Sequence, residues 1–227
     1  MVATSEASAG RERAPLSRRR IIDAAARYID THGLEGLSMH KLGAELDVKA
    51  MSLYNHVANK DDLLDGVMEL FWEEVESNAP AKPDWREGYR SFAHALRDTV
   101  HRHARSARLS ASQRTMPEPA LRCLQAHVGA ATNKGVPEEC AYALLRTITS
   151  YALGTALVEA TWGIAQAGCR PVTSVSDLVR PGIPEELVGV AQVFCIQSDP
   201  EAHFELGLDL MLRDTGDTWE LVEKVSV

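Results

Sequence analysis

The sequence predicts an all-α protein, with a small N-terminal unit of short helices followed by a larger helical body. Three observations lead to this prediction. Apolar residues recur at helical spacing through most of the 227 residues, candidate helix caps precede several of these stretches, and no convincing alternating strand pattern is present. The hydrophobic content of 45% and charged content of 25% are ordinary for a globular protein long enough for one or two domains.

The N-terminal unit is marked by three polar residues, each placed immediately before an apolar-periodic segment. Ser17, Ser38 and Asn59 are suited to accept hydrogen bonds from the first turn of a helix. Gly33 is a natural end for the first helix, and Asp47 lies in the turn after the second. We therefore expect helices at about residues 17–33, 38–46, 49–56 and 59–75, after a disordered basic arm over residues 1–15.

The body begins after a break in the helical pattern. Pro80 and Pro83 interrupt it, and apolar residues then recur at helical offsets from Trp85 to Val100. Further helices are expected at about residues 121–133, 137–167, 184–194 and 199–215, with a long loop before the last two. We assign residues 16–62 to the first domain and residues 63–227 to the second.

Composition excludes several classes of protein. The sequence has no run of about 18 apolar residues, so we expect no membrane-spanning helix. The N-terminal stretch lacks the apolar middle region of a secretory signal, and the four cysteines lie far apart. Both features are typical of a cytoplasmic protein with reduced thiols.

Charge is divided unevenly along the chain, whose formal net charge is −8. Residues 11–60 carry nine Lys and Arg against six Asp and Glu, whereas residues 61–227 carry 15 against 25. Because attraction to phosphate depends on the face that is presented, an acidic body does not prevent a basic N-terminal unit from binding nucleic acid.

The segment "SMHKLGAELDVKAMSLYNHVANKDDLL" has the pattern of two helices joined by a tight turn, with a first helix behind them. In this helix-turn-helix arrangement, the second helix of the pair enters the major groove of DNA. Tyr54, His56 and Lys60 can donate to phosphate oxygens, while Met51 and Ser52 can contact base edges. The outward positions of the expected third helix are Lys49, Ala50, Met51, Ser52, Asn55 and His56.

The stretch "IIDAAARYIDTHGLEGLSMHKLGAELDVKAMSLYNHVANKDDLLD" resembles the DNA-binding domain of TetR-family repressors, and the block "SLYNHVANKDDLL" is its most specific part. The resemblance implies DNA contacts by Ala50, Met51, Ser52, Tyr54, His56 and Lys60. His40 stands where the tetracycline-repressor branch has a base-reading arginine, so the operator should differ. Asp47 stands where the family usually has glycine, and Asp tolerates left-handed geometry moderately well.

Simpler interpretations of these residues remain open. Tyr54 is also compatible with a packing aromatic, and Lys60 with a solvated surface lysine. One alternative to a repressor is an all-helical enzyme or small-molecule carrier with a vestigial helix-turn-helix. Another keeps the DNA binding but makes the protein an activator or a nucleoid-type factor. The sequence contains no constellation of acid, base and nucleophile that would support catalysis, so we predict no catalytic residues.

The body resembles, more weakly, the ligand-binding domain of the tetracycline-repressor branch. The stretches "EECAYALLRTITSYALGTALVEA" and "PEAHFELGLDLML" look like the two helices that pair across that branch's homodimer. A two-fold dimer would place its recognition helices about 34–36 Å apart, one turn of DNA. The resemblance therefore implies a palindromic double-stranded DNA operator, a homodimer, and release from DNA by a small-molecule effector.

The sequence identifies effector contacts only loosely. "HRHAR" at residues 101–105 is interpreted as a solvated basic face, because residues two apart on a helix point to different sides. Arg108 and Ala111 stand where the tetracycline repressor holds magnesium, so we expect no magnesium–tetracycline, no other metal and no cofactor, and an anionic ligand would suit Arg108. The candidate pocket residues are Trp85, Tyr89, Phe92, His101, Arg108, Met116, Tyr151, Glu159 and Trp162.

Overall fold

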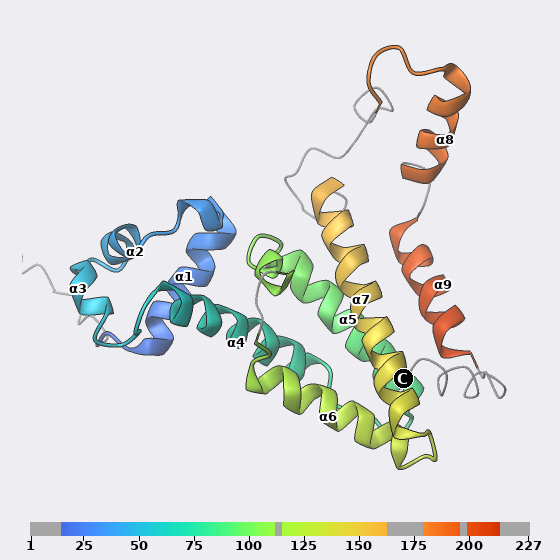
Figure 1. Ribbon diagram of the computed structural model, residues 1–227, viewed down its shortest axis with the longest axis horizontal. Helices are drawn as coiled ribbons and strands as arrows, with labels where there is room; N and C mark the ends of the chain where they lie inside the picture. Colours follow the sequence, from blue (N-terminus) through green and yellow to red (C-terminus); the bar gives the residue numbers. More distant parts are fainter. Residues whose placement is uncertain (1–14, 112–114, 163–178, 196–198, 214–227) are drawn as a thin grey trace, which may run out of the picture.

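The computed structural model describes residues 15–111, 115–162, 179–195 and 199–213, and every regular element in these ranges is helical (Figure 1). The predicted all-α fold is thus confirmed, while the predicted basic arm and most of the long loop lie outside these ranges. Among the described helices, none combines the length and hydropathy that a membrane crossing needs. The elements are α1 (Arg18–His32), η1 (Leu34–Gly36), α2 (Met39–Glu45), α3 (Ala50–Leu53), α4 (Lys60–Asn78), α5 (Trp85–Arg102), η2 (Ala107–Ala111), α6 (Glu118–Thr132), α7 (Glu138–Trp162), α8 (Glu185–Cys195) and α9 (Pro200–Leu212).

The three predicted caps begin the helices of the N-terminal unit. The Ser17 hydroxyl accepts from the Arg20 N–H at 3.3 Å, and the Ser38 hydroxyl accepts from the Lys41 N–H at 3.2 Å. The Asn59 side-chain oxygen accepts from the Asp62 N–H at 2.8 Å. Each bond satisfies one of the free N–H groups in a first helical turn, which explains why the starts of α1, α2 and α4 follow from sequence.

Two predicted helix lengths were wrong. We predicted a third helix over residues 49–56, but α3 is a single turn from Ala50 to Leu53 and the chain then turns through His56. The fourth helix was expected to end near Val75 and instead reaches Asn78. The domain boundary predicted after residue 62 falls within the first turn of α4. This helix therefore belongs to both halves of the molecule.

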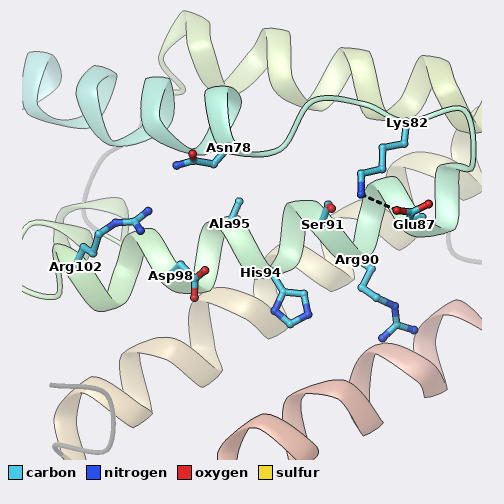
Figure 2. Close-up of a pocket in the computed structure, with 9 residues that line it drawn as sticks. All are labelled: Asn78, Lys82, Glu87, Arg90, Ser91, His94, Ala95, Asp98 and Arg102. Atoms are coloured by element: carbon cyan, nitrogen blue, oxygen red, sulfur yellow. Dashed lines mark hydrogen bonds and ion pairs between the residues drawn. The ribbon is translucent and has the colours of Figure 1, made fainter. Parts of the chain in front are cut away.

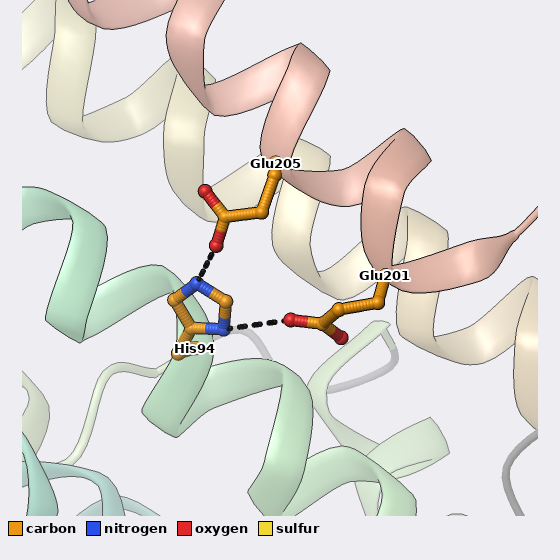
Figure 3. A group of neighbouring side chains, drawn as sticks. All are labelled: His94, Glu201 and Glu205. Atoms are coloured by element: carbon orange, nitrogen blue, oxygen red, sulfur yellow. Dashed lines mark hydrogen bonds and ion pairs between the residues drawn. The ribbon is translucent and has the colours of Figure 1, made fainter.

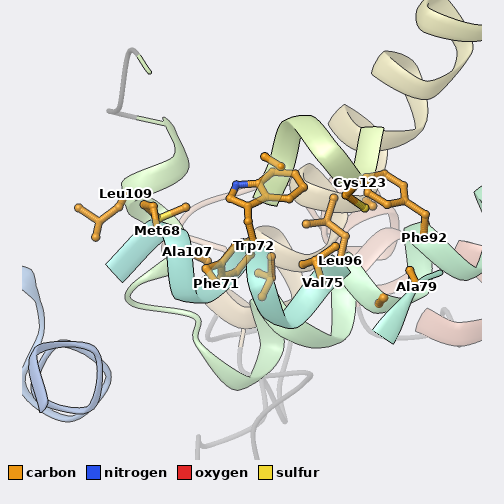
Figure 4. Close-up of a cluster of buried hydrophobic side chains, with 14 of the residues drawn as sticks. Met68, Phe71, Trp72, Val75, Ala79, Phe92, Leu96, Ala107, Leu109 and Cys123 are labelled. Atoms are coloured by element: carbon orange, nitrogen blue, oxygen red, sulfur yellow. The ribbon is translucent and has the colours of Figure 1, made fainter. Parts of the chain in front are cut away.

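The molecule has a head, formed by α1–α3 with the start of α4, and a body formed by the rest of α4 with η2 and α5–α9 (Figure 1). Inside the body, Phe71 and Trp72 of α4 meet Leu96 of α5 and Cys123 of α6 in a buried apolar cluster (Figure 4). Full burial of one such large apolar side chain stabilises the fold by roughly 1.5–3 kcal/mol. The cluster therefore fixes the body end of α4, the same helix whose first turn belongs to the head.

The long helix α7 packs on α5 inside the subunit. Ile148, Ala152 and Ala156 are fully buried there, so this side of α7 meets a helix of its own subunit. The exposed side of α7 instead carries Gly154 and Val158. α9 packs beside α7, and its Leu206 and Leu210 are also exposed.

Candidate functional site

Two residues shape the tight turn between α2 and α3. Asp47 has a φ of 55°, a left-handed conformation that Asp adopts more readily than most residues. Gly43 lies against the chain that leaves the turn, so that a Cβ at this position would stand 2.8 Å from the Val48 carbonyl oxygen. The missing side chain at Gly43 lets α2 approach the start of α3 closely. The expectation that Asp47 would sustain the left-handed turn is confirmed.

α3 is held by its inner side and presents its outer side to solvent. Leu53 is fully buried and Val57 is 1% exposed, so these two residues anchor the helix to the head. Met51 is 74% exposed, which leaves a long apolar side chain free to meet a partner surface. Tyr54 is 44% exposed, and this exposure argues against the packing-aromatic interpretation.

The nine residues predicted to contact DNA belong to α2, α3, the turn that follows α3 and the start of α4. In the structure, α2 and α3 lie at the end of the head that is remote from the body (Figure 1). Six of them are exposed: His40, Lys49, Met51, Tyr54, Asn55 and Lys60. The other three, Ala50, Ser52 and His56, are half-buried. We call these nine residues, which span 21 positions of the sequence, the α3 surface.

The start of α4 is fastened to the rest of the head by ionic and polar contacts. The Arg18 guanidinium donates to both oxygens of Asp62 at 2.9 and 2.8 Å, and the Ala58 N–H donates to the same carboxylate at 2.7 Å. The hydrogen bond from Arg18 holds the pKa of Asp62 below its usual range. Lys60 donates to the Leu37 carbonyl at 3.1 Å, which uses one of its three ammonium protons.

The head also meets the body through Asp30 at the end of α1. His103 Nδ1 lies 2.6 Å from one Asp30 oxygen, while Ser106 donates to the other from its N–H at 3.2 Å and its hydroxyl at 2.8 Å. His103 Nε2 also lies 3.1 Å from Glu74 of α4. The contact with Asp30 raises the pKa of His103, although burial opposes this effect. We call these four residues, Asp30, Glu74, His103 and Ser106, the head–body junction.

The junction corrects our interpretation of "HRHAR" as a solvated basic face. His101 and His103 do point to different sides, as helical geometry requires, but each is partly buried against a carboxylate. His101 Nε2 lies 2.8 Å from Glu159 of α7. The two histidines therefore connect α5 to different neighbours.

Three of the predicted pocket residues are core residues of the body. Trp85 is 6% exposed, and Tyr89 and Phe92 are fully buried, so a ligand could reach none of them without movement of the surrounding helices. The Tyr89 hydroxyl donates to the Ala141 carbonyl at 3.1 Å and thereby joins α5 to α7. Burial raises the pKa of the Tyr89 hydroxyl well above its usual range. Their regular spacing on α5 reflects packing.

The remaining predicted pocket residues have different surroundings. The Tyr151 hydroxyl donates to the carbonyls of His203 and Phe204 at 3.1 and 3.2 Å, which links α7 to α9. Arg108 is exposed on η2, and the side chain of Trp162 lies outside the described part of the structure. Met116, just before α6, lies at the edge of an apolar groove.

Sequence reasoning missed a stripe of arginines and histidines that runs along α5. Arg90, His94, Arg97 and His101 recur at offsets of four, seven and eleven, which places them on one face of the helix. Arg97 binds both oxygens of buried Glu159 at 2.9 and 3.0 Å, and it also reaches Glu201 of α9. The helical spacing of these four residues was the available signal, but their partners lie far away in sequence.

Burial and ion pairing have opposite effects on the pKa of the carboxylate that meets this stripe. Burial alone would raise the pKa of Glu159, but the hydrogen bonds from His101 and Arg97 outweigh it and lower the pKa. His94 lies between Glu205, at 2.6 Å from its Nε2, and Glu201, at 3.9 Å from its Nδ1 (Figure 3). Both carboxylates also bind arginines, Glu205 to Arg90 and Glu201 to Arg97. We therefore interpret this His–Glu cluster as a clamp between α5 and α9.

Two grooves of similar size differ in chemistry. A groove of about 500 Å³ follows α5 and is lined by charges of both signs, among them Lys82 and Glu87, which pair at 2.8 Å (Figure 2). A second groove, of about 470 Å³, lies between α6 and α7 and is mostly apolar. Small-molecule sites are typically apolar with a few placed polar groups, so the second groove is the better candidate.

Comparison with known families agrees with this division into head and body. Residues 21–67 match the family described as "Bacterial regulatory proteins, tetR family", and residues 79–214 match "Tetracyclin repressor-like, C-terminal domain". The chain belongs to the TetR family of transcriptional regulators. The first match covers α2 and α3, and the second covers the body, including the groove between α6 and α7.

Individual TetR-family relatives match along most of the chain. A helix-turn-helix transcriptional regulator of Saccharopolyspora erythraea is 29% identical over 204 residues, covering 89% of this chain and 86% of the relative. A possible TetR-family regulator from Streptomyces coelicolor A3(2) has a structure with a TM-score of 0.70 at 29% identity, over 86% of this chain and 97% of that one.

Two further structures of similar proteins contain a bound partner. ActR of Streptomyces coelicolor in complex with actinorhodin matches with a TM-score of 0.68 at 27% identity, over 88% of this chain and 96% of that one. BioQ with its double-stranded DNA operator matches with a TM-score of 0.53 at 29% identity, over 65% of this chain and 89% of that one. Proteins similar to this chain thus include one solved with a small molecule and one solved with operator DNA.

Proposed function

We propose that this protein is a ligand-responsive transcriptional repressor that binds a palindromic operator as a homodimer and leaves DNA when a small-molecule effector binds. The α3 surface carries this proposal. It presents an exposed short helix and a set of hydrogen-bond donors within the part of the chain that matches the family's DNA-binding domain. The proposed role is regulation without catalysis, in the cytoplasm where operator DNA is found.

The residues of the α3 surface divide into two proposed roles. His40, Met51 and Ser52 read base edges in the major groove, where Met51 offers apolar contact to a thymine methyl. Tyr54, His56 and Lys60 contact phosphates, and Lys60 has two ammonium protons left for this purpose. Lys49, Ala50 and Asn55 complete the surface, and the small side chain of Ala50 allows close approach to DNA.

A homodimer is favoured by apolar residues that the neighbouring helices α7 and α9 leave exposed. Val158 is 45% exposed, and Leu206 and Leu210 are 51% and 53% exposed. Small residues such as Gly154 allow a second helix to approach α7 closely. Pairing these faces about a two-fold axis would bury the apolar side chains and direct two α3 surfaces toward successive major grooves, about 34–36 Å apart.

Release by an effector is proposed to begin in the groove between α6 and α7. ActR, a similar protein, has been solved with actinorhodin, which supports a small-molecule effector for this protein. A shift of the body would reach the head through α4 and through the head–body junction. The first connection is a continuous helix and the second is a set of polar contacts. Through either one, the head, with α3, could move while it stays folded.

Selection of binding sites from a random duplex library, followed by fluorescence anisotropy, tests this function. We expect a palindromic site bound at least about 10³-fold more tightly than scrambled DNA. Met51→Ala should change base preference and cost about 1–3 kcal/mol on the selected site. Lys60→Gln should weaken all sequences and reduce the salt slope by about one.

Lys134→Gln, which removes an exposed lysine at the far end of α6, is the matched control and should bind DNA as the wild type does. Circular dichroism of Lys60→Gln checks that loss of the bond to Leu37 has not unfolded the head. Failure to select any sequence at low salt, with the protein folded, would refute the proposed repressor function.

A further inference from the structure

The groove between α6 and α7 is shaped like a small-molecule site. Leu145 forms its buried floor, and Leu121 and Leu124 of α6 line it opposite the residues of α7. Its volume of about 470 Å³ lies within the range of ligand pockets, which is roughly 300–1,000 Å³. The full lining is Met116, Leu121, Leu124, Gln125, Tyr142, Leu145, Arg146, Thr149 and Ser150.

Several apolar side chains of this groove are open to solvent. Met116 and Leu121 are each 52% exposed, and Tyr142 is 44% exposed. Large apolar residues that border one groove mark a surface that gains stability when it is covered. The groove therefore favours an occupant with an apolar body.

Arg146 gives the groove a positive charge. It follows Tyr142 by one turn of α7 and precedes Ser150 by another, so the three side chains share one face. The nine lining residues include no carboxylate. Among the described residues, Arg146 is exposed and forms no ion pair. Arg90, Arg97 and Arg122 by contrast are all paired with carboxylates of the body.

We propose that the effector is an amphipathic anion, whose apolar body fills the α6–α7 groove and whose carboxylate or sulfonate binds Arg146. This inference rests on the proposed function, since it names the chemical class of that effector. Arg146, which pairs with no carboxylate among the residues that the structure describes, can form a two-point, charge-assisted bond with such a group. Arg108, which we expected to serve an anionic ligand, lies on η2 and is not among the residues that line this groove.

Two matched fluorescent probes test the ligand class without DNA. Anilinonaphthalene sulfonate carries an aromatic body and an anionic group, and phenylnaphthylamine has the same aromatic body without the anion. We expect the sulfonate to bind with one site per subunit, and Arg146→Gln to weaken it about tenfold while leaving phenylnaphthylamine unchanged. Leu121→Glu, at an exposed position, should weaken both probes, and Arg108→Gln should affect neither.

The proposal is overturned if Arg146→Gln binds the sulfonate as tightly as the wild type, or if Leu121→Glu leaves both probes unaffected. It is also overturned if Leu121→Glu dissociates the dimer, because the groove would then be an interface between subunits. Operator affinity of the same variants is measured separately, without probe. If the wild type showed no specific DNA binding, the repressor function would be refuted. The probe affinities report on the groove alone.

Discussion

His103 shows how one residue can make the contact between head and body sensitive to pH. Its pKa is raised, first by the bond to Asp30, which means that the charged ring is stabilised in the folded protein. The resulting stability is fully present below the unfolded pKa of about 6.5 and is lost as pH rises through the raised folded value. The pKa of buried His127 is lowered by burial, so its effect on the pH dependence of stability is opposite. The contribution of His103 must therefore be measured as a difference between the wild type and a variant that changes only this contact.

We therefore predict that Asp30→Asn destabilises the protein by about 1–2 kcal/mol near pH 6, because it removes the charge from a partly buried hydrogen bond. The difference from the wild type should shrink at pH values above the raised pKa of His103. Urea unfolding at fixed protein concentration measures it, with His103→Gln and the double variant completing a thermodynamic cycle. If the variant and the wild type differed by the same unfolding free energy at pH 6 and above the raised pKa of His103, the ion pair would contribute nothing to stability.

At the scale of elements, α3 depends on a glycine in its neighbour α2. Glycine inside a helix is normally unfavourable, yet a Cβ at Gly43 would press against the Val48 carbonyl, a backbone atom that cannot rotate away. Gly43→Ala should destabilise the protein by about 1–3 kcal/mol and displace α3. We expect at least a tenfold loss of operator affinity, measured by anisotropy on the selected site.

Gly129→Ala is the control for this prediction, because Gly129 is also helical but no atom lies within 4 Å of an added Cβ. It should stabilise α6 by roughly 0.5–1 kcal/mol and leave operator affinity unchanged. If Gly43→Ala also bound DNA normally and unfolded no more easily, then α2 and α3 would not be in the close contact described here.

Helix starts that depend on neighbouring residues could be predicted from sequence. Features that depend on contacts between residues far apart in the chain could not. The caps at Ser17, Ser38 and Asn59 act within three residues, so the starts of their helices could be identified directly. The length of α3 was overestimated. The apolar residues Leu53 and Val57 suggested one continuous helix, but both are buried although α3 ends at Leu53, and this packing cannot be read from a short stretch of sequence.

The same distinction separates the α3 surface from the contacts inside the body. The α3 surface lies within one short stretch of sequence, so its residues could be named in advance. The role of the arginine and histidine stripe of α5 could not be predicted, because Arg90 meets Glu205 and Asp209 only after α9, more than a hundred residues later, packs back on the body. Likewise Tyr89 and Phe92 looked like pocket residues by composition, and only packing shows that they are core.

At the scale of the whole molecule, two exposed leucines mark two different surfaces of the body. Leu210 lies on the exposed side of α9 beside α7, and Leu121 lies in the groove between α6 and α7. Both are about half exposed, so a charged replacement at either position should leave the subunit folded. The two positions therefore allow dimerisation and effector binding to be tested independently.

We predict that Leu210→Glu dissociates the homodimer, because it places two like charges near the two-fold axis in an apolar interface. Sedimentation velocity should show monomers at micromolar concentration, while Leu121→Glu stays dimeric. Affinity for the palindrome should fall by at least about 10²-fold, since the second head no longer binds at high effective concentration. Affinity for a half-site should change little, because the α3 surface of each subunit is intact. A Leu210→Glu protein that remained dimeric and bound the palindrome normally would place the interface elsewhere and remove the geometric basis for a palindromic operator.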